Sequence, residues 1–131
     1  QVYAIETKPE AVELLRKNRE HFHMDNIQII EAPAPEGLEE LPVPTHAFIG
    51  GSGGRLLDIL QTLYRKNPHM RIVINAISME TIAELKEVLD TFPVEEEEIL
   101  QMQVSRVKKL LSYHLPQAEN PVWICSFRFQ E

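Results

Sequence analysis

Short apolar, strand-like runs alternate with amphipathic, helix-like segments along almost the whole of this 131-residue chain. The runs at residues 2–5, 27–30, 47–49, 72–74 and 122–129 have the length and the β-branched content of strands. Helical spacing of apolar residues predicts helices near residues 9–23, 56–67 and 81–92. Strands that alternate with helices indicate a parallel α/β sheet with right-handed crossovers.

Two details refine this expected sheet. The continuous run Ile72-Val73-Ile74 is typical of a strand that is covered on both faces. The last two strand regions, residues 99–107 and 122–129, have no helix between them, so we expect them to pair antiparallel at one edge.

Length and composition indicate one domain, residues 1–131, of ordinary globular character: 44% of the residues are hydrophobic and 25% are charged. No apolar run approaches the roughly 20 residues that span a bilayer, and no signal peptide is recognisable. The net charge of −7 argues against nucleic acid as a partner. One cysteine, Cys125, favours a reducing cytoplasm. Because Gln1 is not an initiator Met, we expect a processed product or a fragment.

Glu6 ends the first strand and precedes the first helix. At the carboxyl edge of a nucleotide-binding sheet, a carboxylate in this place accepts both ribose hydroxyls. The alternative interpretation is a charge that only favours the start of the helix.

The cluster Gly50-Gly51-Ser52-Gly53-Gly54 follows a strand and precedes a helix, so a ligand could approach its backbone closely. It lacks the dinucleotide-binding pattern, because Leu56 stands in the place of the third glycine. It does fit the G-x-S-x-G pattern of serine hydrolases, with Ser52 as nucleophile, His114 as base and Asp90 as orienting residue. The short chain, the missing oxyanion segment and the helical position of Asp90 argue against a hydrolase.

Three charged clusters have simpler explanations. His21, His23 and Asp25 lie at a helix end without a second group of ligands, so we expect no metal site. The run at residues 95–98 reads as a solvated loop and strand start. Arg106 with Lys108 and Lys109 forms either an anion-facing patch or a solvated helix end or hairpin.

Several segments together resemble the decarboxylating C15-methyltransferases that act on precorrin-6 or its cobalt form. The similarity runs the whole length of the chain, and the F-I-G-G-S-G-G string is specific to this family among methyltransferases. The segments, in order, are V-Y-A-I-E at residues 2–6, I-E-A-P-A-P-E at 30–36, F-I-G-G-S-G-G at 48–54, I-V-I-N-A at 72–76, Q-M-Q-V-S-R at 101–106 and N-P-V at 120–122.

The resemblance implies S-adenosylmethionine as methyl donor and a carboxylate-rich tetrapyrrole as acceptor. It implies that Glu6 holds the ribose, that Pro33 and Ala34 contact the adenine, and that Gly50 and Gly51 line the cofactor site. Substrate contacts are implied for the residues Ser52, Gly53, Gly54, Asn75 and Arg106. No catalytic acid or base is assigned, because methyl transfer from a sulfonium depends mainly on alignment.

Two departures from the family pattern affect the cofactor site. Relatives usually have Asp where Pro33 stands, and a proline side chain cannot accept a hydrogen bond from the adenine amino group, so adenine recognition should be weaker or be made by the backbone alone. The resemblance also places a first strand, a glycine-rich turn and a helix before Val2. The expected fold is therefore a Rossmann-like, class I methyltransferase sheet that lacks its first strand and helix. The missing strand would lie between the strands that end at Glu6 and Gly50.

The same interpretation makes an assembly prediction. Family resemblance and the alternation of polar and apolar side chains at residues 101–111 predict a homo-oligomer, expected to be a tetramer. Unpaired strand edges would act in the same direction. The alternative for this region is that Met102 and Val104 cover a helix of their own chain. The alternative for the whole chain is a non-catalytic fragment that associates through its exposed strands.

Overall fold

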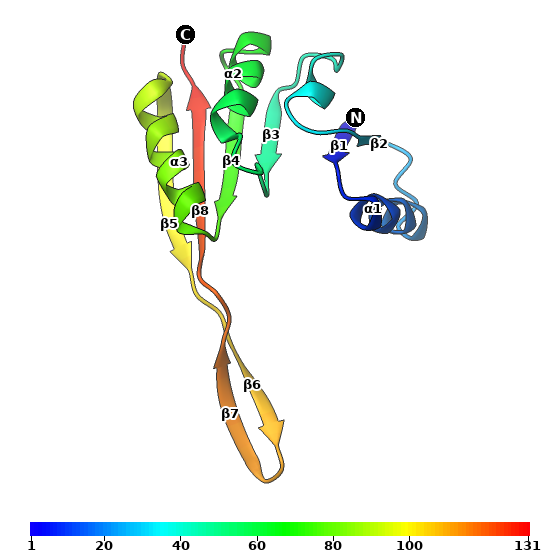
Figure 1. The fold of residues 1–131 in the computed structure, drawn as a ribbon, viewed down its shortest axis with the longest axis vertical. Coiled ribbons are helices and arrows are strands. Elements are labelled where there is room, and N and C mark those ends of the chain that lie inside the picture. The colour runs from blue at the N-terminus through cyan, green and yellow to red at the C-terminus, as the bar shows by residue number, and fades with distance from the viewer.

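A computed structural model describes all residues, 1–131, and contains the predicted alternation of strands and helices (Figure 1). The order of elements is β1 (Val2–Glu6), α1 (Pro9–His21), β2 (Ile27–Glu31), the 3₁₀ helix η1 (Glu36–Leu38), β3 (His46–Ile49), α2 (Leu56–Lys66), β4 (Arg71–Ala76), α3 (Met79–Thr91), β5 (Val94–Met102), β6 (Ser105–Leu110), β7 (Tyr113–Ala118) and β8 (Val122–Phe129).

The strands form three separate groups. β3, β4, β8 and β5 make a four-stranded sheet in that order, β1 pairs only with β2, and β6 pairs only with β7. β1 is parallel to β2 and β3 is parallel to β4, whereas β8 is antiparallel to both β4 and β5. The predicted antiparallel pair at one edge, β8 with β5, is therefore confirmed. No strand lies between β1 and β3, so each keeps one unpaired edge.

Helices α2 and α3 pack on one face of the four-stranded sheet and form the core. Leu56, Leu60 and Val88 from these helices are fully buried against Ile72 and Phe127 of the strands. Burying each large aliphatic side chain contributes about 1.5–3 kcal/mol to folding, so this face holds the sheet together. None of the helices combines the length and the apolarity that a bilayer crossing requires.

The opposite face of this sheet is open. Ile72 and Ile74 are buried, whereas Val73 between them is only half-buried, and Phe48 on the neighbouring strand is 66% exposed. The prediction that residues 72–74 form a strand covered on both faces is therefore wrong for this structure, because no helix packs behind Val73. The continuous β-branched run correctly indicated a strand, but it did not indicate whether both faces of that strand are buried.

Residues 103–120 leave the sheet as a projecting β-ribbon of β6 and β7, and every residue of both strands is exposed. β5 is parallel to β4 in this arrangement, so its end at Met102 lies at the carboxyl edge of the sheet. The basic residues Arg106, Lys108 and Lys109 thus belong to a hairpin. The expectation of a loop at residues 95–98 is corrected: the run lies inside β5, where Glu96 pairs with Arg71 and Arg128.

Cys125 offers a direct check on the packing of β8. Its side chain is fully buried, and burial, followed by the charge of Glu97, raises the pKa of the thiol to about 11. We expect a thiol-reactive disulfide at pH 8 to label the native chain at least about 100-fold more slowly than the chain unfolded in guanidinium chloride, because the thiolate is the reacting form. Equal rates in the two states would contradict this packing.

Candidate functional site

Three chain segments meet in a small pocket of about 230 Å³ at the carboxyl ends of β1 and β3. The first wall is the end of β1 with the following turn, the second is the loop after β2, and the third is the glycine loop after β3. The carboxyl ends of parallel strands are the usual ligand-binding edge of an α/β sheet. The lining residues are Ile5, Glu6, Thr7, Ala32, Pro33, Ala34, Gly51, Ser52, Gly53, Arg55 and Ile59.

Glu6 is fixed in place by the turn that follows it. Its Oε1 accepts hydrogen bonds from the Thr7 N–H at 2.8 Å and from the Lys8 N–H at 3.0 Å, whereas Oε2 has no protein partner. The hydrogen bond from Lys8, assisted by that from Thr7, holds the pKa of Glu6 below its ordinary value against desolvation. Glu6 is thus both the helix-start charge and an ionised acceptor with one oxygen available to a ligand.

The loop after β2 offers one backbone donor to the pocket. Pro33 and Pro35 have no N–H, and the Ala32 N–H donates to the Glu6 carbonyl at 3.2 Å. Ala34 therefore carries the remaining N–H of this segment, and it meets no protein acceptor. The side chains here are all apolar, so a planar ring could pack against them and receive one hydrogen bond from the backbone.

The glycine loop is open on the ligand side. A Cβ added at Gly51, Gly53 or Gly54 would meet no atom within 4 Å, and Gly53 and Gly54 have φ values of +59° and +79° that disfavour other residues. A ligand can therefore approach this backbone directly. Ser52 within the loop is half-buried, and only its backbone carbonyl accepts a hydrogen bond, from the Arg55 N–H.

The structure separates the residues of the hydrolase alternative. His114 lies on β7 of the projecting hairpin, opposite Lys109. Asp90 is an exposed residue of α3 that pairs with Lys86. Neither reaches Ser52, so the glycine loop has no base and no orienting carboxylate for nucleophilic catalysis.

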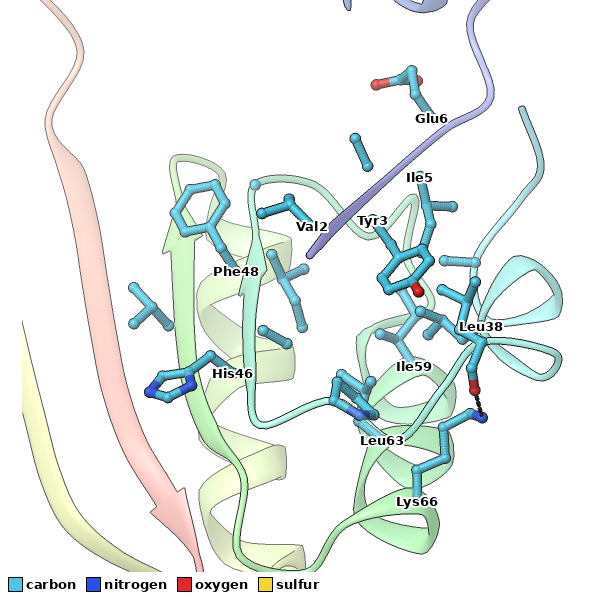
Figure 2. Close-up of a pocket in the computed structure, with 18 of the residues that line it drawn as sticks. Val2, Tyr3, Ile5, Glu6, Leu38, His46, Phe48, Ile59, Leu63 and Lys66 are labelled. Atoms are coloured by element: carbon cyan, nitrogen blue, oxygen red, sulfur yellow. Dashed lines mark hydrogen bonds between the residues drawn. The ribbon is translucent and has the colours of Figure 1, made fainter. Parts of the chain in front are cut away.

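A larger cavity of about 1360 Å³ separates β1 from β3 (Figure 2). Val2 and Tyr3 border it on one side, and His46 and Phe48 border it on the other, with Leu63 of α2 at its base. The walls are mostly apolar, and the unpaired edges of β1 and β3 both face the space. This is the place where the resemblance puts a further strand.

The structure brings most of the predicted site residues together. Glu6, Pro33, Ala34, Gly51, Ser52 and Gly53 line the small pocket, and Gly50 lines the larger cavity next to it. Asn75 is half-buried on the open face near the end of β4 and lines neither space. Gly54 also lies outside both. Arg106 is 73% exposed on the hairpin and pairs with Glu119 at 2.5 Å.

Two polar residues of the pocket were not anticipated. Arg55 follows the glycine loop, and its guanidinium binds Glu36 across the pocket rim. Thr7 contributes to the wall beside Glu6. The sequence does not indicate the Arg55–Glu36 contact, because the two residues are 19 positions apart. Glu36 lies in the connection after β2, and Arg55 lies in the connection after β3.

The fold and the pocket define a Rossmann-like methyltransferase of class I. A solved S-adenosylmethionine-dependent O-methyltransferase from Thermotoga maritima covers all of this chain and 51% of its own, at TM-score 0.74 and 14% identity, which shows the fold alone. The family model for a precorrin methyltransferase domain matches residues 1–128. This chain therefore belongs to the precorrin methyltransferase family.

Individual relatives agree with this assignment. The solved precorrin-6Y C5,15-methyltransferase of Geobacter metallireducens is 33% identical at TM-score 0.87, covering 98% of this chain and 68% of its own. The cobalt-precorrin-6B C(15)-methyltransferase (decarboxylating) of Salmonella typhimurium is 30% identical over 132 residues, which is all of this chain and 68% of that protein. A protein of Methanothermobacter thermautotrophicus, described as a probable enzyme of the same name, is 41% identical over 90 residues, 67% of this chain and 47% of its own. This chain thus spans about half to two thirds of the length of the curated relatives it matches.

Proposed function

We propose that this chain is part of an S-adenosylmethionine-dependent enzyme that methylates C15 of a precorrin or cobalt-precorrin. In the same reaction an acetate side chain of the tetrapyrrole loses its carboxyl group as carbon dioxide, in cobalamin biosynthesis. The names of the relatives support the reaction. The observation that carries the proposal is the pocket that unites Glu6, Ala34 and the glycine loop at one sheet edge.

The residues of this pocket fit the cofactor. The free Oε2 of Glu6 is suited to accept from the ribose hydroxyls, and the free N–H of Ala34 is suited to donate to the adenine ring. The open backbone at Gly50 and Gly51 allows close approach of the rest of the cofactor, its methionine part. When bound, S-adenosylmethionine supplies a methyl group activated by the positive sulfonium. The Pro33 side chain provides an apolar contact to the adenine and no acceptor for the adenine amino group.

The tetrapyrrole would lie against the outer part of the same edge. Ser52, Gly53 and Gly54 are proposed to face it, with Asn75 on the open side of the sheet and Arg106 at the base of the hairpin. A cation there suits a substrate rich in carboxylates. We assign no acid or base, because these residues act by positioning the acceptor carbon in line with the methyl group.

Assembly is also part of the proposal. We propose a homo-oligomer, specifically a tetramer, formed mainly through the β6–β7 hairpin. Met102 is 51% exposed and Val104 is 43% exposed, so neither covers a helix of its own chain. The fully buried Cys125 supports a cytoplasmic location, and the net charge of −7 supports partners other than nucleic acid or membrane.

A second candidate follows from the unpaired edges of β1 and β3. Exposed strand edges recruit other chains, so this chain could act as a non-catalytic unit that associates through them. This candidate predicts that chains assemble through the unpaired strand edges that border the larger cavity, rather than through the β6–β7 hairpin. Deleting the hairpin distinguishes the two modes of assembly, because only assembly through the hairpin would then be lost.

Nuclear magnetic resonance titration with S-adenosylhomocysteine at millimolar concentration tests the cofactor assignment on the chain as it stands. We expect shifts at the N–H groups of Thr7, Ala34 and Gly51, because these surround the pocket. Glu6→Gln should weaken the titration by about tenfold, since a charge-assisted hydrogen bond contributes roughly 1.5–3 kcal/mol.

Glu10→Gln is the matched control for this titration. Glu10 lies in the first turn of α1, is exposed and is not a pocket residue, so its substitution removes a nearby charge without touching the site. Equal effects of the two substitutions, or shifts confined to the β6–β7 hairpin, would contradict the assignment of the pocket.

A further inference from the structure

The ion pair between Arg55 and Glu36 bridges two walls of the small pocket. Arg55 Nη1 donates a charge-assisted hydrogen bond to Glu36 Oε2 at 3.0 Å, and Nη2 lies 2.8 Å from Oε1 as a second contact of the ion pair. Nε also lies 3.6 Å from Asp58 on the first turn of α2. The hydrogen bond from Arg55 holds the pKa of Glu36 below its ordinary value. With Asp58 the pair forms a network of three charges, which separates it from isolated surface ion pairs, most of which contribute little.

The glycine loop needs such a restraint, because little else fixes it. No protein atom lies within 4 Å of an added Cβ at Gly51, Gly53 or Gly54. Within the loop, the one backbone bond outside the strand ladder runs from the Arg55 N–H to the Ser52 carbonyl at 3.1 Å. The side chain of Arg55 therefore joins this open loop to the segment of Glu36, and the next residue along, Leu56, donates its N–H to Glu84 Oε2 at 3.1 Å.

The other end of the bridge fixes the wall that carries the single backbone donor. Glu36 begins η1, two residues after Ala34. η1 is itself held by the Gly37 N–H, which donates to the Pro33 carbonyl at 2.8 Å. The carboxylate of Glu36 therefore moves with the segment that presents the Ala34 N–H, and this segment has no side-chain acceptor with which to orient an adenine ring.

We infer that Arg55 is a positioning residue that, through Glu36, sets the spacing between the glycine loop and the Ala34 N–H. The inference rests on the proposed function only for the identity of the ligand, the adenosine part of the cofactor. Because the Pro33 side chain supplies no acceptor and the Pro33 carbonyl already accepts from the Gly37 N–H, recognition depends on the shape of the pocket, and the ion pair fixes that shape across its rim.

Amide hydrogen exchange of the native chain tests the restraint without any ligand. In Arg55→Met, we expect the hydrogen-bonded N–H groups of Gly37 and of position 55, which donate to the carbonyls of Pro33 and Ser52, to exchange at least about tenfold faster than in the unsubstituted chain, as loss of a charge-assisted pair allows. Arg55→Lys should fall between the two, because it keeps the charge and loses the second N–O contact that the guanidinium makes. A double variant that swaps the two side chains, Arg55→Glu with Glu36→Arg, should restore most of the protection against hydrogen exchange.

Arg65→Met is the matched control. Arg65 also lies on α2 and binds Glu39 just after η1 at 3.0 Å, but neither residue lines a pocket. We expect Arg65→Met to leave exchange at the N–H groups of Gly37 and Arg55 within about twofold of the unsubstituted chain. Unchanged exchange in Arg55→Met, or the same acceleration in Arg65→Met, would overturn the inference.

The titration with S-adenosylhomocysteine then separates this inference from the proposed function. We expect Arg55→Met to weaken the shift at Ala34 by at least about threefold, and Arg65→Met to leave it unchanged. Amide hydrogen exchange can respond as predicted while the unsubstituted chain shows no NMR shift with S-adenosylhomocysteine. In that case the restraint by the Arg55–Glu36 pair stands and the assignment of the ligand fails. If the shifts are equal in all variants, the positioning role fails while the ligand stands.

Discussion

Removing residues 105–118 should convert an assembly of about 60 kDa, four times the 15.1 kDa of one chain, into a monomer. The base of the hairpin is suited to this deletion, because the Glu119 N–H already donates to the Val104 carbonyl at 2.8 Å. A two-residue Asn-Gly turn can close the chain there. Light scattering across a wide concentration range gives the mass of each form.

The physical reason is the amount of apolar surface on the hairpin. Val107, Leu110 and Tyr113 are 61–67% exposed, and Leu111 at the turn is 87% exposed. A two-stranded ribbon alone is marginally stable in water, and contiguous exposed apolar side chains mark an interface. Neither strand contributes to the core, so the deletion should leave the thermal unfolding of the sheet nearly unchanged.

Point variants at the turn provide a finer control. Leu111→Asp places a charge at the most exposed apolar side chain and should weaken assembly. Ser112→Asp adds the same charge to the neighbouring turn residue without removing apolar surface, and should weaken it less. A deletion variant that keeps the full mass would contradict assembly through the hairpin, and would favour association through the unpaired edges of β1 and β3.

Supplying the strand that fills the space between β1 and β3 should produce the largest change in cofactor affinity. The resemblance places a strand, a glycine-rich turn and a helix before residue 2. We expect a chimera with that segment from the Geobacter metallireducens relative to bind S-adenosylmethionine at least about 100-fold more tightly than this chain, equivalent to roughly 2.8 kcal/mol. Titration calorimetry on the two proteins measures the difference.

Two structural features motivate this prediction. The cavity of about 1360 Å³ between β1 and β3 leaves the two halves of the binding edge without a shared neighbour. Pro33 removes a side-chain acceptor from the adenine wall, so this chain has little with which to compensate. A micromolar dissociation constant for this chain without the added segment would contradict the prediction.

The position of the pocket could be predicted from the sequence because it follows from strand order. Glu6 and Gly50 each end a parallel strand, so their loops must lie at one edge of the sheet. The gap beside them was implied by the resemblance, and the structure agrees with it. These features depend on the pattern of strands and helices rather than on individual contacts.

The remaining features depend on tertiary contacts that local patterns do not encode. The acidic run lies in a strand because β5 pairs with β8, and Glu96, at a bulge of β5, pairs with Arg71 and Arg128, residues that are distant in the sequence. The second strand of the hairpin was missed because Pro116 interrupts its pattern, although a proline is tolerated in a ribbon with open edges. The contact between Arg55 and Glu36 likewise needs the fold before it can be seen.

Methyl transfer by the chimera tests the central claim most directly. The chimera is supplied with cobalt-precorrin-6B and with S-adenosylmethionine that carries a labelled methyl group. The experiment measures, in the same reaction, the methyl groups transferred and the carbon dioxide released. We predict one carbon dioxide for each methyl group, and a loss of about 10- to 100-fold in turnover efficiency with Glu6→Gln but not with Glu10→Gln. A chimera that binds the cofactor tightly yet transfers no methyl group to the tetrapyrrole would contradict the account.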